Sequence, residues 1–183
     1  MGVLENIDKT GFLGSEFIKW LWHRSEMKNG MFEVKENNLG AVELWVHDRL
    51  KLEKGEADRR ESLTYAGSIT DLGEAKMALG KGKELKEAGV KLTIDGDEWF
   101  LTLDSRYLDI KSLKTPKTEK LSGGTAEEDD PESRFYERVF LIEKAVDVMD
   151  GLFAVFMAER TGPEWNRRTL PSIKKWRENY AGV

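Results

Sequence analysis

The stretch from about Ser133 to Arg160 constrains the fold most, because it has the pattern of one long amphipathic helix. Its apolar residues recur at alternating steps of four and three, the spacing of one helix face. They are Phe135, Val139, Ile142, Val146, Met149, Phe153 and Phe156. A helix of about 28 residues measures about 42 Å, longer than one domain core requires. We therefore expect most of it to pack on its own sheet and one end to contact a partner.

Composition bounds the class of protein. The 183 residues include 34 acidic side chains against 29 Lys and Arg, a net charge of −5, so binding to nucleic acid would need locally concentrated cations. The absence of cysteine excludes disulfides and thiol chemistry. No apolar run approaches the roughly 20 residues of a membrane span, and 1–10 lacks the apolar core of a signal peptide. We expect a cytoplasmic protein with no membrane partner, folded as a single domain over 1–183.

Alternating apolar residues predict a sheet. Val42, Leu44 and Val46 alternate with polar neighbours, and Asp95-Gly96 between two such runs is a hairpin turn. We expect strands at 31–34, 41–52, 62–66, 90–94, 99–103 and about 108–113, and helices at 16–24, 72–79, 133–160 and 170–180. Residues 84–88 are compatible with helix or strand. The fold class is α+β, a mostly antiparallel sheet with helices on one face, including one long C-terminal amphipathic helix.

Local signals refine this prediction. Ser15 can cap the helix at 16–24, and Asp71 with Glu74 resembles a capping box for the helix at 72–79. Trp20 and Trp22 lie on different flanks of their helix, so we expect one in the core and the other at an interface or under a loop. The polar stretch at about 115–132, with its acidic run at 127–130, predicts a flexible acidic loop.

The inventory of catalytic side chains is thin. His23 and His47 are the only histidines, and neither stands in a cluster with metal-ligand spacing. Asp104 and Asp109 could belong to a two-metal nuclease, but their spacing alone does not favour one. Gly80 and Gly82 follow the short helix, whereas the glycines of a phosphate-binding loop precede one. We therefore predict no enzyme activity, no metal and no cofactor.

Three basic clusters stand out against the acidic average. The first surrounds the end of the helix at 72–79, the second follows the strand at about 108–113, and the third lies near Trp165 and Trp176. A mixture of cations and aromatic rings suits nucleic acid, although such clusters are also common on ordinary solubilising surfaces. The DNA-binding residues predicted from these clusters are Lys76, Lys81, Lys83, Lys86, Lys111, Lys114, Arg167, Arg168, Lys174 and Lys175.

Three segments taken together resemble a known family. They are LGSEFIKWLWHRSEMKNGMFEV, ITDLGEAKMALGKGKELKEAGVKLTI and ESRFYERVFLIEKAVDVMDGLFAVFMAER. In order and approximate spacing they resemble the C-terminal half of the recombination-associated protein RdgC family. The resemblance implies a non-enzymatic protein whose two subunits close into a ring around duplex DNA and restrain RecA-dependent recombination.

The chain also departs from that family. The family's N-terminal region is absent, and the basic residues expected just before the short helix are replaced by 62–66. The nearest substitutes are Arg59, Arg60 and the lysines at 76–86, and the Gly80-Lys81 step matches. The leading hypothesis is an RdgC-like, nucleoid-associated protein that binds duplex DNA through backbone charge contacts and forms homo-oligomers. The alternative is an interaction or assembly module that keeps the fold without binding DNA.

Overall fold

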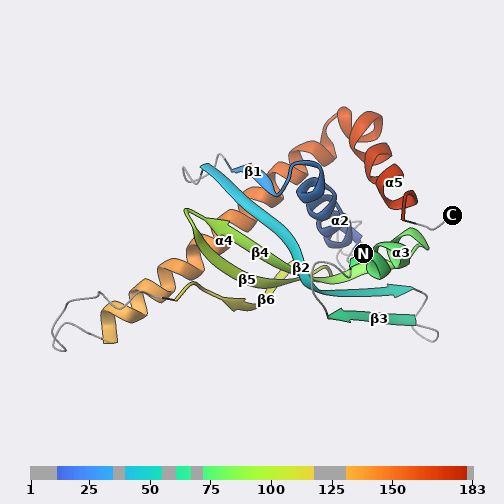
Figure 1. The fold of residues 1–183 in the computed structure, drawn as a ribbon. Coiled ribbons are helices and arrows are strands. Elements are labelled where there is room, and N and C mark those ends of the chain that lie inside the picture. Colours follow the sequence, from blue (N-terminus) through green and yellow to red (C-terminus); the bar gives the residue numbers. More distant parts are fainter. Residues whose placement is uncertain (1–11, 35–39, 55–60, 67–71, 118–130, 181–183) are drawn as a thin grey trace, which may run out of the picture.

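The computed structural model describes residues 12–34, 40–54, 61–66, 72–117 and 131–180. Helices and strands follow one another along the chain in mixed order (Figure 1). The elements are α2 (Phe12–Met27), β1 (Met31–Val34), β2 (Gly40–Lys54), β3 (Glu61–Ala66), α3 (Leu72–Gly80), β4 (Glu84–Ile94), β5 (Asp97–Asp104), β6 (Asp109–Lys114), α4 (Pro131–Thr161), the π-helical turn η3 (Trp165–Thr169) and α5 (Leu170–Glu178).

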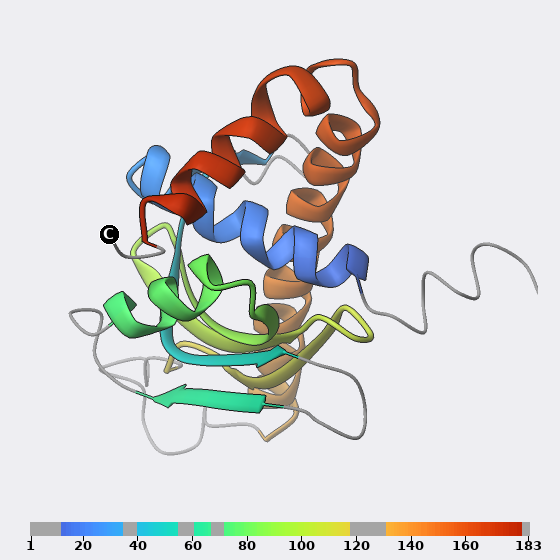
Figure 2. The same cartoon turned by 90° about the vertical axis from the view of Figure 1, so that its right-hand side faces the viewer.

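The strands within the described residues form one antiparallel sheet in the order β1-β2-β4-β5-β6, and β3 pairs with the second half of β2. Asp95 and Gly96 have positive φ in the tight β4–β5 turn, a conformation that suits Gly and is tolerated by Asp. The helices gather against one face of this sheet (Figures 1 and 2). The predicted α+β class is therefore confirmed.

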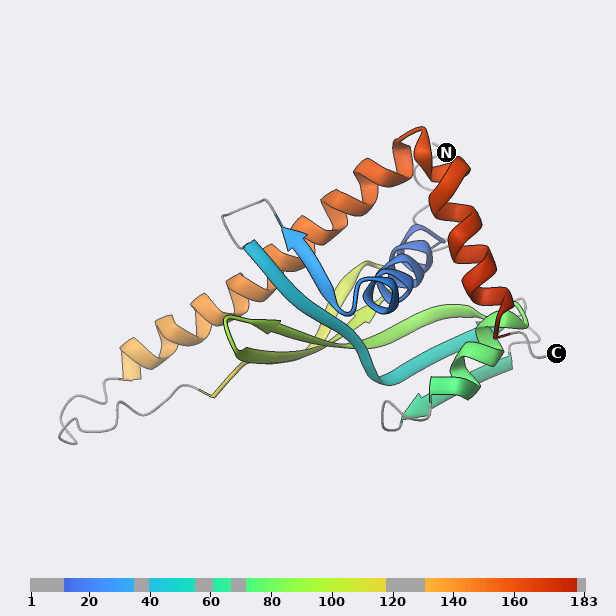
Figure 3. The same cartoon turned by 45° about the horizontal axis from the view of Figure 1, so that its top comes forward.

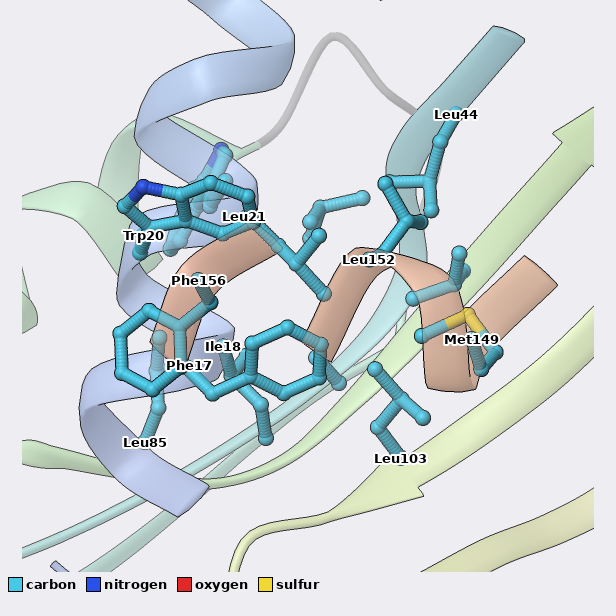
Figure 4. Close-up of a cluster of buried hydrophobic side chains, with 14 of the residues drawn as sticks. Phe17, Ile18, Trp20, Leu21, Leu44, Leu85, Leu103, Met149, Leu152 and Phe156 are labelled. Atoms are coloured by element: carbon cyan, nitrogen blue, oxygen red, sulfur yellow. The ribbon is translucent and has the colours of Figure 1, made fainter. Parts of the chain in front are cut away.

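The core lies between that sheet face and the helices. The alternating residues Val42, Leu44 and Val46 of β2 point into it, as predicted. Figure 4 shows a cluster in which α2 meets α4 over the sheet. Phe17 packs edge-on against Phe153 with ring centroids 5.2 Å apart, and side chains of this size contribute most to local stability.

Helix α4 confirms the long helix predicted near 133–160, but only its second half is packed. The fully buried residues of α4 begin at Ala145 and end at Phe156. The first turns extend past the end of the sheet (Figures 1 and 3), and there Phe135, Tyr136 and Phe140 are 61–62 % exposed. We call residues 131–144 the α4 arm.

Helix α2 begins at Phe12, so the prediction that Ser15 caps its N-terminus is wrong. Ser15 is a residue of the helix itself, and its hydroxyl donates a 2.7 Å hydrogen bond to Glu84. Trp20 and Trp22 are both buried, because α5 covers Trp22. Residues 84–88 belong to strand β4. The capping residue Asp71 and most of the predicted loop at 115–132 lie outside the described residues, although α4 already begins at Pro131.

Strand β6 is an irregular edge of the sheet. Its pairing with β5 shifts register between Phe100 and Thr102, and Ser112 has a φ of 53°. A bulge of this kind bends an edge strand and interrupts its hydrogen-bonding pattern. Lys111 and Lys114 flank the bulge and place cations along the same edge.

Candidate nucleic-acid interface

A half-buried carboxylate fixes α5 to the rest of the protein. Glu26, near the end of α2, accepts hydrogen bonds from the indole N–H of Trp22 at 3.0 Å and of Trp176 at 2.8 Å. It also pairs with Lys76 at 2.6 Å and accepts a 3.3 Å hydrogen bond from the hydroxyl of Tyr180. This group, called the Glu26 network, joins α2, α3 and α5, because its members come from all three helices or their ends.

The outward side of η3 and α5 carries exposed cations. Arg167 and Arg168 are 76 % and 84 % exposed, and each lies near Glu164, at 3.9 and 3.0 Å. Lys174 and Lys175 are exposed one to two turns further on. Residues 164–178 contain five Lys and Arg against two Glu, a local charge of +3 on a chain whose net charge is −5. We call these four side chains the α5 ridge.

The aromatic half of the third predicted cluster is not available to a ligand. Trp165 and Trp176 are buried: Trp165 packs edge-on against Phe156, and Trp176 packs in the same way against Trp22. Their indole rings anchor the segment that carries the ridge. The expected mixture of cations and aromatic rings is therefore wrong at this site, and only its cations face outward.

The first predicted cluster divides between the interior and the surface. Lys76 belongs to the Glu26 network, and its Nζ lies 4.6 Å from the centre of the Tyr180 ring, so it has a structural role. Lys81 is exposed in the turn after α3, whereas Lys83 and Lys86 are half-buried. Helix α3 packs against α5, so this cluster lies on elements adjoining the α5 ridge.

The second cluster lies elsewhere. Lys111 pairs with Asp104 and lies 3.6 Å from Glu87, while Lys114 is exposed at the end of β6. All three ribbon views place β6 and α5 on separate parts of the molecule (Figures 1, 2 and 3). The structure thus brings Arg167, Arg168, Lys174 and Lys175 together on one segment but does not unite them with Lys111 and Lys114.

The candidate catalytic side chains have structural partners. His23 is buried, its Nε2 lies 3.0 Å from the Ser172 hydroxyl, and burial together with the nearby Arg24 lowers its pKa. Burial alone would raise the pKa of Asp104, but hydrogen bonds from Lys111 and from the backbone N–H of Arg106 lower it. Among the described residues, no group of three His, Asp or Glu side chains could hold a metal ion.

A cleft of about 910 Å³ lies between α2, β1, the second half of α4 and η3. Its charged side chains are largely paired: Glu159 binds Arg24 and accepts a 3.0 Å hydrogen bond from the indole of Trp20. Arg168, at its rim, pairs with Glu164. Most of its remaining wall is apolar, including Phe32 and Leu152. These contacts tie α4 to α2.

Sequence reasoning missed Glu26, because no local motif marks a carboxylate that collects donors from distant helices. Its spacing of four residues from Trp22 was the single available signal. In comparisons with family models, curated proteins and solved structures, nothing matches this chain. None of the described helices is long and apolar enough to cross a membrane.

Proposed function

We propose that this chain is a non-enzymatic DNA-associated module that contacts the phosphate backbone of duplex DNA through the α5 ridge. The supporting observation is the gathering of Arg167, Arg168, Lys174 and Lys175 on one exposed segment of an acidic chain. The resemblance to the RdgC family, which implies duplex binding without catalysis, points the same way.

The mode of binding follows from the side chains present. The ridge offers long, flexible cations and no exposed aromatic ring, so it suits phosphates better than base edges. Glu164 lies close enough to both arginines to compete with a phosphate for them. Exposed ion pairs of this kind contribute little to stability, however, so a phosphate can replace Glu164. The Glu26 network holds the ridge in place from beneath, since Trp176 belongs to the same helix as Lys174 and Lys175.

The experiment is a titration of duplex DNA across a salt series. Four phosphate contacts predict that log K falls against log salt with a slope of about −3 to −4. The fourfold variant R167E/R168E/K174E/K175E should lose binding and most of that slope. The matched control K28E/K54E/R106E/K117E reverses four exposed cations on other elements and has the same net charge. Equal binding by the two variants, or affinity that does not depend on salt, would contradict the proposal.

A second candidate function is self-association through the α4 arm together with Val146, which follows it on the same helix. Phe135, Val139, Ile142 and Val146 continue the buried stripe of α4 beyond the core, and Phe135 and Ile142 are 62 % and 42 % exposed. Ile142 and Val146 line a groove of about 540 Å³ against Ile110 and Leu113 of the β6 edge. Their spacing of four, three and four residues is self-complementary in an antiparallel pair.

The occupant that fits this surface is therefore a second copy of the chain. A two-fold axis between Phe140 and Leu141 places Phe135 of one copy beside Val146 of the other, at the groove, and Val139 beside Ile142. The substitution Phe135→Asp should convert a dimer into a monomer in sedimentation, while Tyr107→Asp, at a turn residue that is similarly exposed, should not. A wild-type chain that remains monomeric at high concentration would rule this function out.

A further inference from the structure

The described helices pack on one face of the sheet (Figures 1 and 2), and the opposite face, which we call the open face, carries aromatic as well as basic side chains. Its residues alternate with the core residues along each strand, as the pleat requires. They include Trp45 and His47 on β2, Lys91 on β4 and Phe100 on β5, and the acidic Glu43 and Glu98 lie on the same face. Trp45, His47 and Lys91 are half-buried, and Phe100 is 37 % exposed.

Strand register aligns four of the open-face side chains. Trp45 pairs with Lys91, Lys91 with Phe100, and Phe100 with Lys114, across β2, β4, β5 and β6. The row therefore alternates aromatic ring and cation over four neighbouring strands. Because neighbouring strands lie about 4.8 Å apart, the two aromatic residues are about 10 Å apart, with a lysine between them. We call these four residues the cross-strand row.

Contacts hold the row in place. The Trp45 ring lies against Gly30, where an added Cβ would approach it to 2.6 Å, and its indole N–H donates to Glu43 at 2.6 Å. The Phe100 ring meets His47 edge-on, with ring centroids 6.0 Å apart, and Lys91 Nζ lies 5.8 Å from the ring centre. The aromatic side chains are therefore fixed before any ligand arrives, which limits the entropy lost on binding.

We infer that the cross-strand row is a binding site for single-stranded nucleic acid. A base can stack on the exposed ring of Phe100, and the lysines on either side of it can contact the phosphates of the same strand. Duplex DNA suits this surface less, because its bases already stack on one another. Lys91 pairs with Glu98 at 2.5 Å, but Glu98 is exposed, so a phosphate can replace it.

This site is independent of the α5 ridge. The row lies on the open sheet face, whereas α5 packs with the other helices on the opposite side. The ridge offers charge without accessible rings, and the row offers a ring with two cations. Substitutions in the row should therefore leave duplex binding at the ridge unchanged, and substitutions in the ridge should leave single-strand binding at the row unchanged.

The test measures binding of a labelled oligothymidylate of about eight nucleotides, a length within the usual range of single-strand sites. Wild-type protein should bind it at low salt. Phe100→Ala should weaken binding about tenfold or more, the loss expected for one stacked base. Phe100→Tyr, which keeps an aromatic face, should restore affinity. The control Tyr107→Ala, which removes an exposed ring outside the row, should bind as wild type does.

The lysines supply a second readout. Lys91→Gln and Lys114→Gln should each reduce the salt slope by about 0.7, while Lys117→Gln should leave it unchanged. The fourfold ridge variant should lose duplex DNA and keep the oligothymidylate. The inference is overturned if wild-type protein does not bind the oligonucleotide at low salt, or if Phe100→Ala and Tyr107→Ala bind equally well.

Discussion

Removal of the Glu26 carboxylate should release α5 from the protein. The substitution Glu26→Ala leaves two indole N–H donors, those of the buried Trp22 and Trp176, without an acceptor. Each buried unpaired donor costs about 1–3 kcal/mol. Lys76 loses its partner as well, but its ammonium is partly exposed and still lies 3.5 Å from the Tyr180 hydroxyl, so that loss is small.

We therefore expect Glu26→Ala to lower the free energy of unfolding by about 3–5 kcal/mol. With a dependence on urea of about 2 kcal/mol per molar, the midpoint should fall by about 1.5–2.5 M. Tryptophan fluorescence can follow this transition, since the chain has six tryptophans and two of them belong to the network. Glu26→Gln keeps one acceptor oxygen and should lose about half as much stability.

A local measurement separates release of α5 from general destabilisation. In Glu26→Ala the backbone amides of α5 should lose protection from hydrogen exchange before those of the central strand β4. The control Glu178→Ala removes an exposed carboxylate near the end of α5 and should change the stability by less than about 0.5 kcal/mol. A loss below about 1 kcal/mol for Glu26→Ala, with α5 still protected, would refute the role assigned to this carboxylate.

Three further perturbations test the packing. The pKa of His23 lies below its ordinary value of 6.5 in the folded protein, so the unfolded chain binds the proton first as the pH falls. The free energy of unfolding should therefore decrease below about pH 6.5. His23→Gln should flatten this part of a series of denaturation curves measured at different pH. Gly89→Ala would place a Cβ 2.4 Å from the backbone oxygen of His47 and should lower the free energy of unfolding, measured by chemical denaturation, by about 1–3 kcal/mol. An unchanged free energy of unfolding would contradict the close approach of β2 and β4 at this residue. Phe156→Ala removes a fully buried ring in contact with Phe17, Trp20 and Trp165 and should cost about 3–5 kcal/mol, whereas a cost under about 1 kcal/mol would show that the core refills the space.

Local patterns predicted the elements well because their causes are local. The alternation around Leu44 reports a strand with one buried side, and the stripe around Met149 reports one side of a helix. Neither pattern indicates where along the helix the sheet beneath it ends. Phe135 and Met149 therefore look equivalent in the sequence, although one is largely exposed and the other packs in the core.

The candidate sites were harder to predict because their partners are distant in the chain. In the sequence Lys76 looks like a surface cation, but in the structure it forms an ion pair with Glu26, fifty residues earlier in the chain. In the sequence Trp176 looks like an aromatic ring available beside cations, but in the structure it packs against Trp22. The cross-strand row depends on the register of four strands, and no short motif encodes the alignment of Lys91 with Phe100.

The bulge in β6 limits the ways in which copies of this chain can meet. A regular edge strand is a template on which another extended chain can add hydrogen bond by hydrogen bond, the route by which sheets grow into fibrils. Here the left-handed backbone at Ser112 interrupts that template, and Lys111 and Lys114 repel an identical edge. Crowded molecules should therefore resist sheet-to-sheet aggregation along this border.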